Sequence, residues 1–328
     1  MSLVEQIKHK SRDAELHWLV NRVITPELPH LVEALQICSN LLLYNSPSHP
    51  ETDKSAERGP SITLAVSSGK SEDLKGILVR DGAYITKMNV QLKERHFTRV
   101  ISRIIMKKPI HLPQIITAKM GIDAAVALIV QAMSVFNDPA KSCENSHTIL
   151  MSVFNDLLGE LQRAKNSLQL PTDPKLVFPL HRLDPASFDP ELPPHISLDI
   201  YISQAEVCVD LKDLRKVEEK PWCEIDNAGK SYVDKVRDSM SAGKTDIDLH
   251  SKERGLLGGV FTHFTNKYEP QDYITRCATY NGNVVMVNKK IEVSSADPVL
   301  LSAFTKLDSV EHMVSSFLDN IKTLFKGE

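Results

Sequence analysis

Three short triplets are the parts of this sequence that come closest to a chemical motif, since each has the Gly-Lys-Ser/Thr order that ends a phosphate-binding loop. They are Gly69-Lys70-Ser71, Gly229-Lys230-Ser231 and Gly243-Lys244-Thr245. A P-loop also needs a glycine five residues earlier, so that backbone amides can converge on the anion. Those positions hold Leu64, Glu224 and Asp238. None of the triplets follows a predicted buried strand and opens a helix, so we interpret them as solvated turns.

Other residue types that could do chemistry are also scattered. GLLGGVF (255–261) lacks the G-x-G-x-x-G order, and no βαβ unit surrounds it, so a loop entering a strand is predicted. The twelve histidines include no i, i+4 pair and no H-E-x-x-H, and we expect His17 and His30 on the surface or at helix ends. No G-x-S-x-G marks a nucleophile.

We therefore predict no catalytic, cofactor-binding or metal-ligating residues, and a protein that is not an enzyme and needs no cofactor. An active site whose residues converge only in three dimensions stays open as an alternative. The five cysteines are far apart and form no C-x-x-C pair, which argues against a disulfide framework and a zinc site. Free, mostly buried thiols in a reducing cytosol are expected.

The composition is that of an ordinary folded protein. The 328 residues are 42% hydrophobic and 25% charged, with a net charge of −3. This balance gives no electrostatic reason to expect nucleic acid or an anionic membrane as the main partner. We find no apolar run near the roughly 18 residues that span a bilayer, and the N-terminus is too polar for a signal peptide. No direct membrane insertion is predicted.

Four segments have the apolar spacing of amphipathic helices, and they must position whatever function the chain has. The first, 15–44, is interrupted by Pro26 and Pro29, where a kink or a break is expected. The others are 122–136, 150–168 and 300–325, the last with Asp297-Pro298 as its N-cap and first turn.

Glu311 alone breaks the apolar ladder of the last helix. Either its carboxylate reaches water near a helix end, which we favour, or it is a buried polar group that sets helix register.

The period changes to two between these helices, which predicts strands. Asp81-Gly82 and Asn281-Gly282 stand where tight hairpin turns are expected. The predicted strand segments are 61–68, 74–93, 96–105, 195–214 and 273–293, of which 195–214 is either two strands or one bent strand.

The predicted class is α+β, with an antiparallel helical bundle built from both chain termini and the middle, and an inserted antiparallel β domain. The bundle comprises 1–44, 113–170 and 296–328, and the β domain comprises 61–112 and 190–295. Residues 45–60 and 220–255 are predicted to be mobile loops because they are polar and rich in turn residues.

Two further segments have simple interpretations. The proline-dense stretch 171–194 is predicted to be extended over a surface. MSVFND occurs at 133–138 and again at 151–156, and Pro139 should end the first helix. Residues 139–146 then form the turn of a helical hairpin, and the short echo is interpreted as a local duplication or a coincidence.

Three longer blocks follow one another along the chain. They are ELHWLVNRVITPELPHLVEAL (15–35), LMSVFNDLLGELQRAKNSLQLP (150–171) and ELPPHISLDIYISQAEVCVDLKDL (191–214). Together and in this order, they resemble the Rogdi family, whose fungal members are the small subunit of the RAVE complex. The last helix closes the chain as in that family, where it was labelled a leucine zipper. The long polar segments 45–60 and 220–255 depart from the family pattern.

This resemblance implies a non-catalytic scaffold or adaptor that promotes reassembly of the vacuolar-type proton ATPase from its peripheral and membrane sectors, and so supports vacuolar acidification. It implies a large propeller-containing partner, a Skp-type adaptor and peripheral-sector subunits as partners. It also implies a cytoplasmic protein recruited to vacuolar or endosomal membranes. If the helical bundle is complete within one chain, a monomer is expected outside the complex, and homodimerisation through an exposed seam is the alternative. A coiled-coil scaffold in vesicle tethering or trafficking is the alternative, because helix seams do not specify partners.

Overall fold

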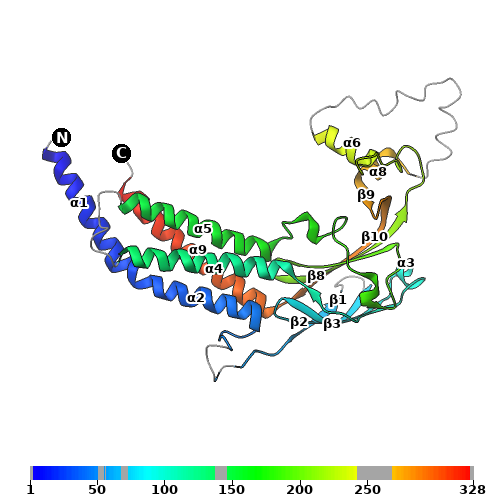
Figure 1. The fold of residues 1–328 in the computed structure, drawn as a ribbon, viewed down its shortest axis with the longest axis horizontal. Coiled ribbons are helices and arrows are strands. Elements are labelled where there is room, and N and C mark those ends of the chain that lie inside the picture. The colour runs from blue at the N-terminus through cyan, green and yellow to red at the C-terminus, as the bar shows by residue number, and fades with distance from the viewer. Residues whose placement is uncertain are drawn as a thin grey trace.

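A computed structural model describes residues 3–50, 55, 57–67, 73–136, 146–241 and 268–325. Long helices lie side by side at one end of an elongated molecule, and antiparallel sheets lie at the other (Figure 1). The α+β class predicted from the sequence is therefore confirmed. Residues 139–145 of the predicted turn at 139–146 lie outside the described residues. Gly69-Lys70-Ser71, Gly243-Lys244-Thr245 and GLLGGVF (255–261) also lie outside them.

The long helices follow the predicted segments closely. A π-helical turn, η1 (Val20–Ile24), joins the first two without a break, upstream of the prolines. Pro26 lies in the first turn of the second helix, where its missing N–H is not needed, and Pro29 is tolerated inside it. The helices are α1 (Leu3–Leu19), α2 (Thr25–Tyr44), α4 (Pro113–Phe136), α5 (Ser146–Gln169) and α9 (Pro298–Leu324).

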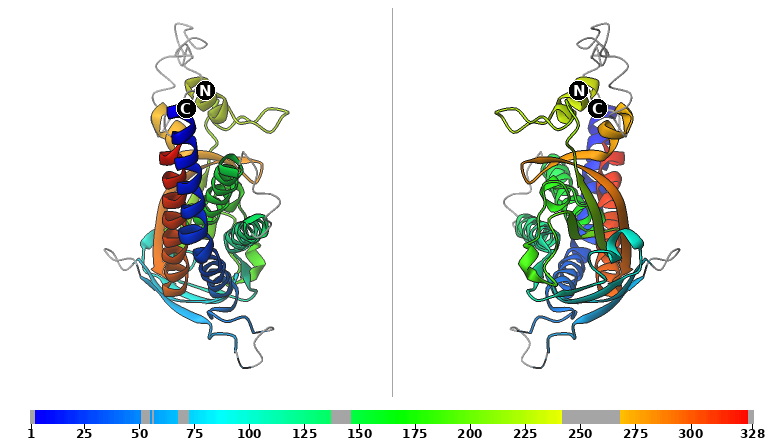
Figure 2. Two further views of the ribbon diagram at one scale, coloured as in Figure 1. Left: turned by 90° about the vertical axis from the view of Figure 1, so that its left-hand side faces the viewer. Right: turned by 90° about the vertical axis from the view of Figure 1, so that its right-hand side faces the viewer.

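Four of these helices contact one another in a closed cycle: α2 with α4, α4 with α5, α5 with α9, and α9 with α2. Figure 2 shows them next to one another when the molecule is viewed from its helical end. The apolar stripe of α9 is buried inside the same chain, and it comprises Leu300, Ala303, Leu307, Val310, Val314, Phe317, Leu318 and Ile321. The rings of Phe154 and Phe317 lie 6.2 Å apart and join α5 to α9.

Polar residues cap the start of α9 and pair it with α5. Asp297 is its N-cap, as predicted, and accepts hydrogen bonds from the amides of Val299 and Leu300 at 2.9 and 3.0 Å. Glu311 is partly buried and forms an ion pair with Lys165 of α5. The favoured interpretation, a carboxylate that reaches water, is therefore incomplete, because the side chain is partly exposed but is also paired with a lysine on another helix.

The first sheet has the order β1-β2-β3-β4-β6, with β5 also pairing β3. Gly82 has a φ of +56° in the predicted turn between β2 and β3. A short helix, α3 (Arg95–Thr98), occupies the start of the predicted strand 96–105, so that only its end is a strand. The strands are β1 (Ile62–Ser67), β2 (Leu74–Asp81), β3 (Tyr84–Leu92), β4 (Arg103–Met106), β5 (Ile110–His111) and β6 (Phe188–Asp189).

The second sheet has the order β7-β8-β10-β9 and is antiparallel throughout. The hairpin predicted at Asn281-Gly282 is confirmed, and both residues have positive φ, as this turn requires. A short helix, α8 (Pro270–Arg276), replaces the start of the predicted strand 273–293. The segment 195–214 is two strands. The strands are β7 (Ile196–Ser203), β8 (Glu206–Lys216), β9 (Cys277–Tyr280) and β10 (Asn283–Ala296).

Residues 220–241 correct the prediction of a mobile loop over 220–255. They include helix α6 (Tyr232–Ser241), and Trp222 is buried with its ring stacked on Tyr273 at 4.9 Å. The high polar content concealed a small second core, which explains the error. This core comprises Val217, Trp222, Val233, Tyr273, Cys277, Val284 and Met286.

The other predicted loops are held at several points. In the segment 45–60, Arg58 forms a 2.8 Å ion pair with Asp81 at the end of β2, and residues 51–54 and 56 lie outside the described part. The proline-dense stretch is mostly extended, with short 3-10 turns η3 (Pro174–Leu176) and η4 (Pro185–Ser187).

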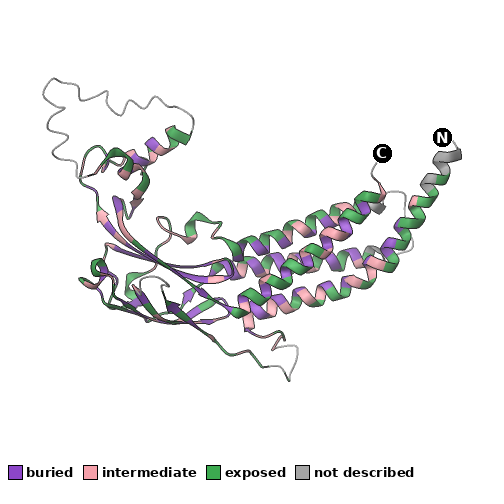
Figure 3. Ribbon diagram, turned by 180° about the vertical axis from the view of Figure 1, so that it is seen from behind, coloured by how far each residue is buried: buried purple, intermediate pink, exposed green. Residues whose placement is uncertain are grey.

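Helix α4 is the one described helix that is long and apolar enough to cross a membrane, judged by length and composition over Pro113–Ser134. The sequence analysis overlooked this run. In the structure α4 packs against α2 and α5, with Ile115, Ala118 and Ile122 fully buried. Figure 3 shows the alternation of buried and exposed residues along the helices. A core helix with one buried face accounts for this composition.

Candidate interaction surfaces

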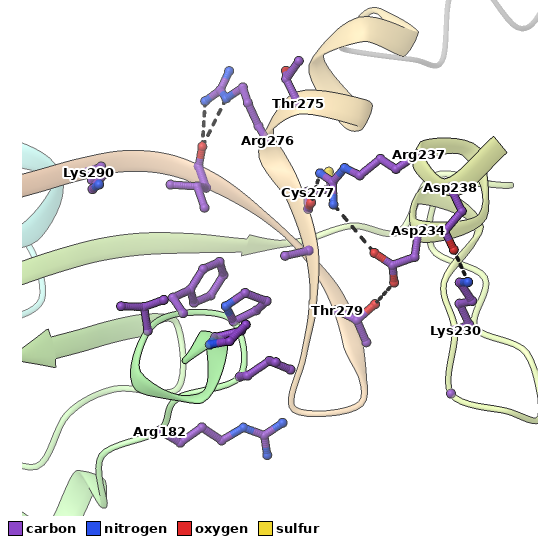
Figure 4. Close-up of a pocket in the computed structure, with 18 of the residues that line it drawn as sticks. Arg182, Lys230, Asp234, Arg237, Asp238, Thr275, Arg276, Cys277, Thr279 and Lys290 are labelled. Atoms are coloured by element: carbon purple, nitrogen blue, oxygen red, sulfur yellow. Dashed lines mark hydrogen bonds and ion pairs between the residues drawn. The ribbon is translucent and has the colours of Figure 1, made fainter. Parts of the chain in front are cut away.

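A cavity of about 1120 Å³ lies at the sheet end of the molecule (Figure 4). One side is the proline-dense segment, and the others are α6, α8, β9 and part of β10. It is therefore assembled from three stretches that are well separated in the sequence, within 174–182, 228–238 and 275–290. Its lining includes Val177, Phe178, Pro179, Leu180, Arg182, Lys230, Asp234, Arg237, Asp238, Arg276, Cys277, Thr279, Val287 and Lys290.

The cavity lining is basic. Among the described residues, its cationic side chains are Arg182, Lys230, Arg237, Arg276 and Lys290, and its acidic ones are Asp234 and Asp238, so the described lining carries an excess of three positive charges. This contrasts with the net charge of −3 of the whole chain. Charge of one sign gathered in a cleft focuses the electrostatic potential and attracts the opposite sign.

Two arginines are held rigidly by main-chain oxygens. Arg237 donates from Nε to the carbonyl of Ile274 at 2.7 Å and from Nη2 to that of Cys277 at 2.5 Å. Arg276 donates from Nη2 to the carbonyl of Val287 at 2.9 Å, and so covers the edge of β10 beyond the last pair with β9. Carbonyls position these guanidinium groups, and each also has a carboxylate nearby: Nη1 of Arg237 lies 3.7 Å from Asp234, and Nη1 of Arg276 lies 4.0 Å from Asp272.

The two acids of the cavity are already engaged. Asp234 accepts hydrogen bonds from the hydroxyls of Ser231 and Thr279 at 2.6 and 2.8 Å. Burial by itself would raise the pKa of Asp234, but these hydrogen bonds outweigh it and lower the pKa. Asp238 forms an ion pair with Lys230. The carboxylate of Asp234 therefore serves as a fixed negative charge, and that of Asp238 is held by its lysine partner.

The triplet Gly229-Lys230-Ser231 lies at this cavity and is not a P-loop. Gly229 has a φ of +79° in a turn, and the Ser231 hydroxyl accepts from the amide of Asp234 at 3.1 Å, at the start of α6. The prediction of a turn is confirmed, although Ser231 is buried and not solvated. Cys277 is no nucleophile either, because burial raises the pKa of its thiol to about 11.

A buried charge cluster beside the cavity ties the proline-dense segment to the second sheet. Asp199 is fully buried and accepts from the amide of Phe178 at 3.0 Å, from His181 at 2.9 Å and from Lys212 at 3.3 Å. Lys212 also donates to Asp210 at 2.5 Å. Burial raises the pKa of Asp210, and the charge of Lys212 opposes the rise. Sequence reasoning missed this cluster because no local spacing marks it.

Of the described residues weighed as candidates in the sequence, Gly229, Lys230 and Cys277 line the cavity, and His17, His30, Cys38 and Cys208 do not. His17 and His30 are exposed on α1 and α2, as predicted. Cys38, Cys208 and Cys277 are free and buried, and Cys223 is free and partly exposed. Within the described ranges, no three His, Cys, Asp or Glu side chains are grouped so that they could hold a metal ion.

The outward face of α4 is a second candidate surface. Lys119 and Asp123 are the only charged residues of this helix, and they pair with each other. Met120 and Val130 are 59% and 52% exposed. On α1, Trp18 is 61% exposed. Large apolar side chains in contact with water are frequent at protein interfaces, and tryptophan is enriched there.

The comparisons with known proteins agree with the resemblance drawn from the sequence. The family model described as "Rogdi leucine zipper containing protein" matches residues 15–322. The chain belongs to this family. A relative from Saccharomyces cerevisiae, "Regulator of V-ATPase in vacuolar membrane protein 2", is 23% identical over 325 residues, which cover 94% of this chain and 90% of the relative.

The family's name refers to a leucine zipper. In this member of the Rogdi family, the apolar residues of α9 are buried against α2 and α5 of the same chain. The last helix is therefore part of an intramolecular core, and its leucine-containing stripe is not exposed for a second chain.

Proposed function

We propose that this Rogdi family member is a non-catalytic adaptor that regulates a vacuolar-type proton ATPase by promoting reassembly of its peripheral and membrane sectors. The observation that supports the proposal best is the similarity to the yeast V-ATPase regulator over nearly the full length of both chains. The cavity and the charge cluster also favour a binding role, since their ionisable groups are paired or held as fixed charges.

The proposed mechanism is geometric. The helices form a stiff antiparallel bundle (1–44, 113–170 and 296–328), and the β domain (61–112 and 190–295) presents a second surface at a fixed distance from it. A body that holds two partners at once raises their effective concentration without any chemical step. The proposed partners are a large propeller-containing subunit, a Skp-type adaptor and peripheral-sector subunits of the ATPase, met in the cytoplasm and at vacuolar or endosomal membranes.

The test is a pull-down with the full chain from cells switched between glucose-starved and glucose-fed conditions, read by mass spectrometry. We expect ATPase peripheral-sector subunits, with recovery that changes with glucose. Recovery of vesicle-tethering factors in their place would support the alternative trafficking scaffold and refute the proposal.

A pair of surface variants tests the α4 face in the same assay. Met120→Glu with Val130→Glu changes exposed side chains, so the fold should be retained while one partner is lost. Leu301→Glu is the matched control, because Leu301 is 55% exposed on α9. Equal recovery with both variants would show that the α4 face does not bind a partner.

A further inference from the structure

We infer that the basic cavity is a docking groove for an acidic, extended segment of a partner protein that carries an apolar anchor residue. The inference does not depend on the proposed role in ATPase assembly, because it rests only on the shape, charge and lining of the cavity. No local motif predicts it, since the lining comes from the proline-dense segment, α6, α8, β9 and β10.

The size of the groove fits a chain segment better than a metabolite. Its volume of about 1120 Å³ exceeds the range of about 300–1,000 Å³ that is usual for pockets that hold small molecules. The walls are also separate pieces of chain, because in Figure 4 the proline-dense segment with Arg182 lies on one side of β9, and Arg237 and Lys230 lie on the other. An extended peptide that crosses β9 can contact both.

The positive charge of the groove is held in place before a partner arrives. Arg237 and Arg276 are fixed by carbonyl oxygens, as described above. Arg182 has no carboxylate partner among the described residues, and its guanidinium lies 5.4 Å from the centre of the Tyr280 ring. A binding group that is already ordered loses little entropy when it pairs with a carboxylate.

The same wall offers an apolar contact next to the charge. Leu180 is 60% exposed, only two residues from Arg182. Phe178 packs against Tyr280 with ring centroids 5.3 Å apart, so that the wall is rigid. A cationic group beside an exposed apolar group on one wall matches a segment in which an acidic residue lies near a large apolar side chain.

The experiment measures fluorescence anisotropy with the full-length protein at 150 mM salt. The probe is a fluorescein-labelled dodecapeptide that repeats the order Asp-Glu-Leu-Glu, and its counterpart has lysine at every acidic position. We expect the acidic peptide to bind at least ten-fold tighter than its counterpart. The variant Arg182→Glu should weaken binding at least ten-fold, and Leu180→Asp at least five-fold.

Lys322→Glu is the matched control, because it makes the same change in net charge at an exposed site on the last turn of α9. It should change the dissociation constant less than two-fold. Since Arg182 and Leu180 are exposed, both variants should keep the melting temperature of the wild type, and Arg182→Ala provides a milder version of the same test.

Three results would overturn the inference. Equal weakening by Arg182→Glu and Lys322→Glu would show that the peptide responds only to overall charge. Full competition by millimolar inorganic phosphate, together with unchanged binding by Leu180→Asp, would show that the cavity is a site for small anions and not for a peptide. Equal affinity for the acidic peptide and its lysine-containing counterpart would also refute the inference.

Discussion

The ion pair between Arg80 and Asp297 offers the sharpest test of how the helices are joined to the sheets. Arg80 lies on β2 and Asp297 caps α9, and neither side chain is exposed at all. Nε of Arg80 lies 2.5 Å from Oδ2 of Asp297, and Nη2 lies 3.2 Å from Oδ1. Nη1 of Arg80 donates to the carbonyl of Gly82 at 2.8 Å. The pair therefore has most of its hydrogen bonds satisfied.

Replacing Asp297 with alanine removes two contributions to the free energy of unfolding. The buried guanidinium of Arg80 is left without its counter-charge, which costs about 3–5 kcal/mol. The N-cap of α9 is lost as well, which costs about 1 kcal/mol. We expect a total loss of about 4–6 kcal/mol, a large share of the roughly 5–15 kcal/mol that stabilises a typical domain.

The assay is urea unfolding followed by circular dichroism, with Asp297→Ala, Asp297→Asn and the double variant Arg80→Leu/Asp297→Asn. The asparagine keeps the cap, so Asp297→Asn should lose less stability than Asp297→Ala. The double variant should be more stable than Asp297→Asn alone, because no unpaired charge remains buried. A loss below about 1 kcal/mol for Asp297→Ala would refute the assignment of a buried pair.

Three further predictions concern single sites. Leu318→Asp buries a charge in the helical core and should lower the melting temperature sharply in a thermal scan, and an unchanged value would show that Leu318 is not buried. Gly121→Ala should destabilise the fold, because a Cβ there would lie 2.9 Å from a main-chain oxygen of α5. Gly159→Ala, with open space around its Cβ position, should raise the free energy of unfolding by up to about 1 kcal/mol. A higher urea midpoint for Gly121→Ala than for Gly159→Ala would contradict this packing. Hydrogen bonds from Lys290 and Tyr201 lower the pKa of Glu292 in the folded state. The contribution of Glu292 to stability is therefore present when the pH is above the pKa of the unfolded chain, near 4.5, and is lost as the pH falls through the pKa of the folded state. The urea midpoint of Glu292→Gln should therefore lie below that of the wild type at pH 7 and approach it below pH 4, and a gap that stays constant over this range would refute the assignment.

The parts of the fold that depend on local spacing could be predicted from the sequence. Leu318 and Ile321 recur at the helical period, and burial of one helix face follows from that period alone. Asn281-Gly282 and Asp297-Pro298 are short signals whose physical cause lies in the backbone of the same few residues. These features need no knowledge of distant parts of the chain.

The candidate sites could not be predicted, because they are made by pairs that are far apart in the sequence. Arg80 and Asp297 are separated by 217 positions, and Lys165 meets Glu311 across 146. Trp222 was not predicted to be buried, because the residues around it in the sequence are polar. The three-residue spacing of Val233 and Val236 is the local pattern that could have indicated a helix with a buried face. The positive charge of the basic cavity is also not evident from the sequence, because its cationic residues come together only in the folded chain.

The contacts between the helices and the sheets bear directly on the proposed adaptor role, since two surfaces act together only if the distance between them is fixed. Gln114, at the start of α4, accepts from the amide of Ile202 on β7 and donates to its carbonyl, both at 2.7 Å. It also donates to the carbonyl of Ser167 near the end of α5 at 2.8 Å. Together with Arg80 and Asp297, this side chain joins both layers, and a single hydrophobic cluster continues across the junction. If Gln114→Ala and Asp297→Asn weakened simultaneous binding of two partners while leaving each separate affinity unchanged, rigidity would be the property that matters. If simultaneous binding were unaffected in the folded variants, the helices would be only a support for the sheets.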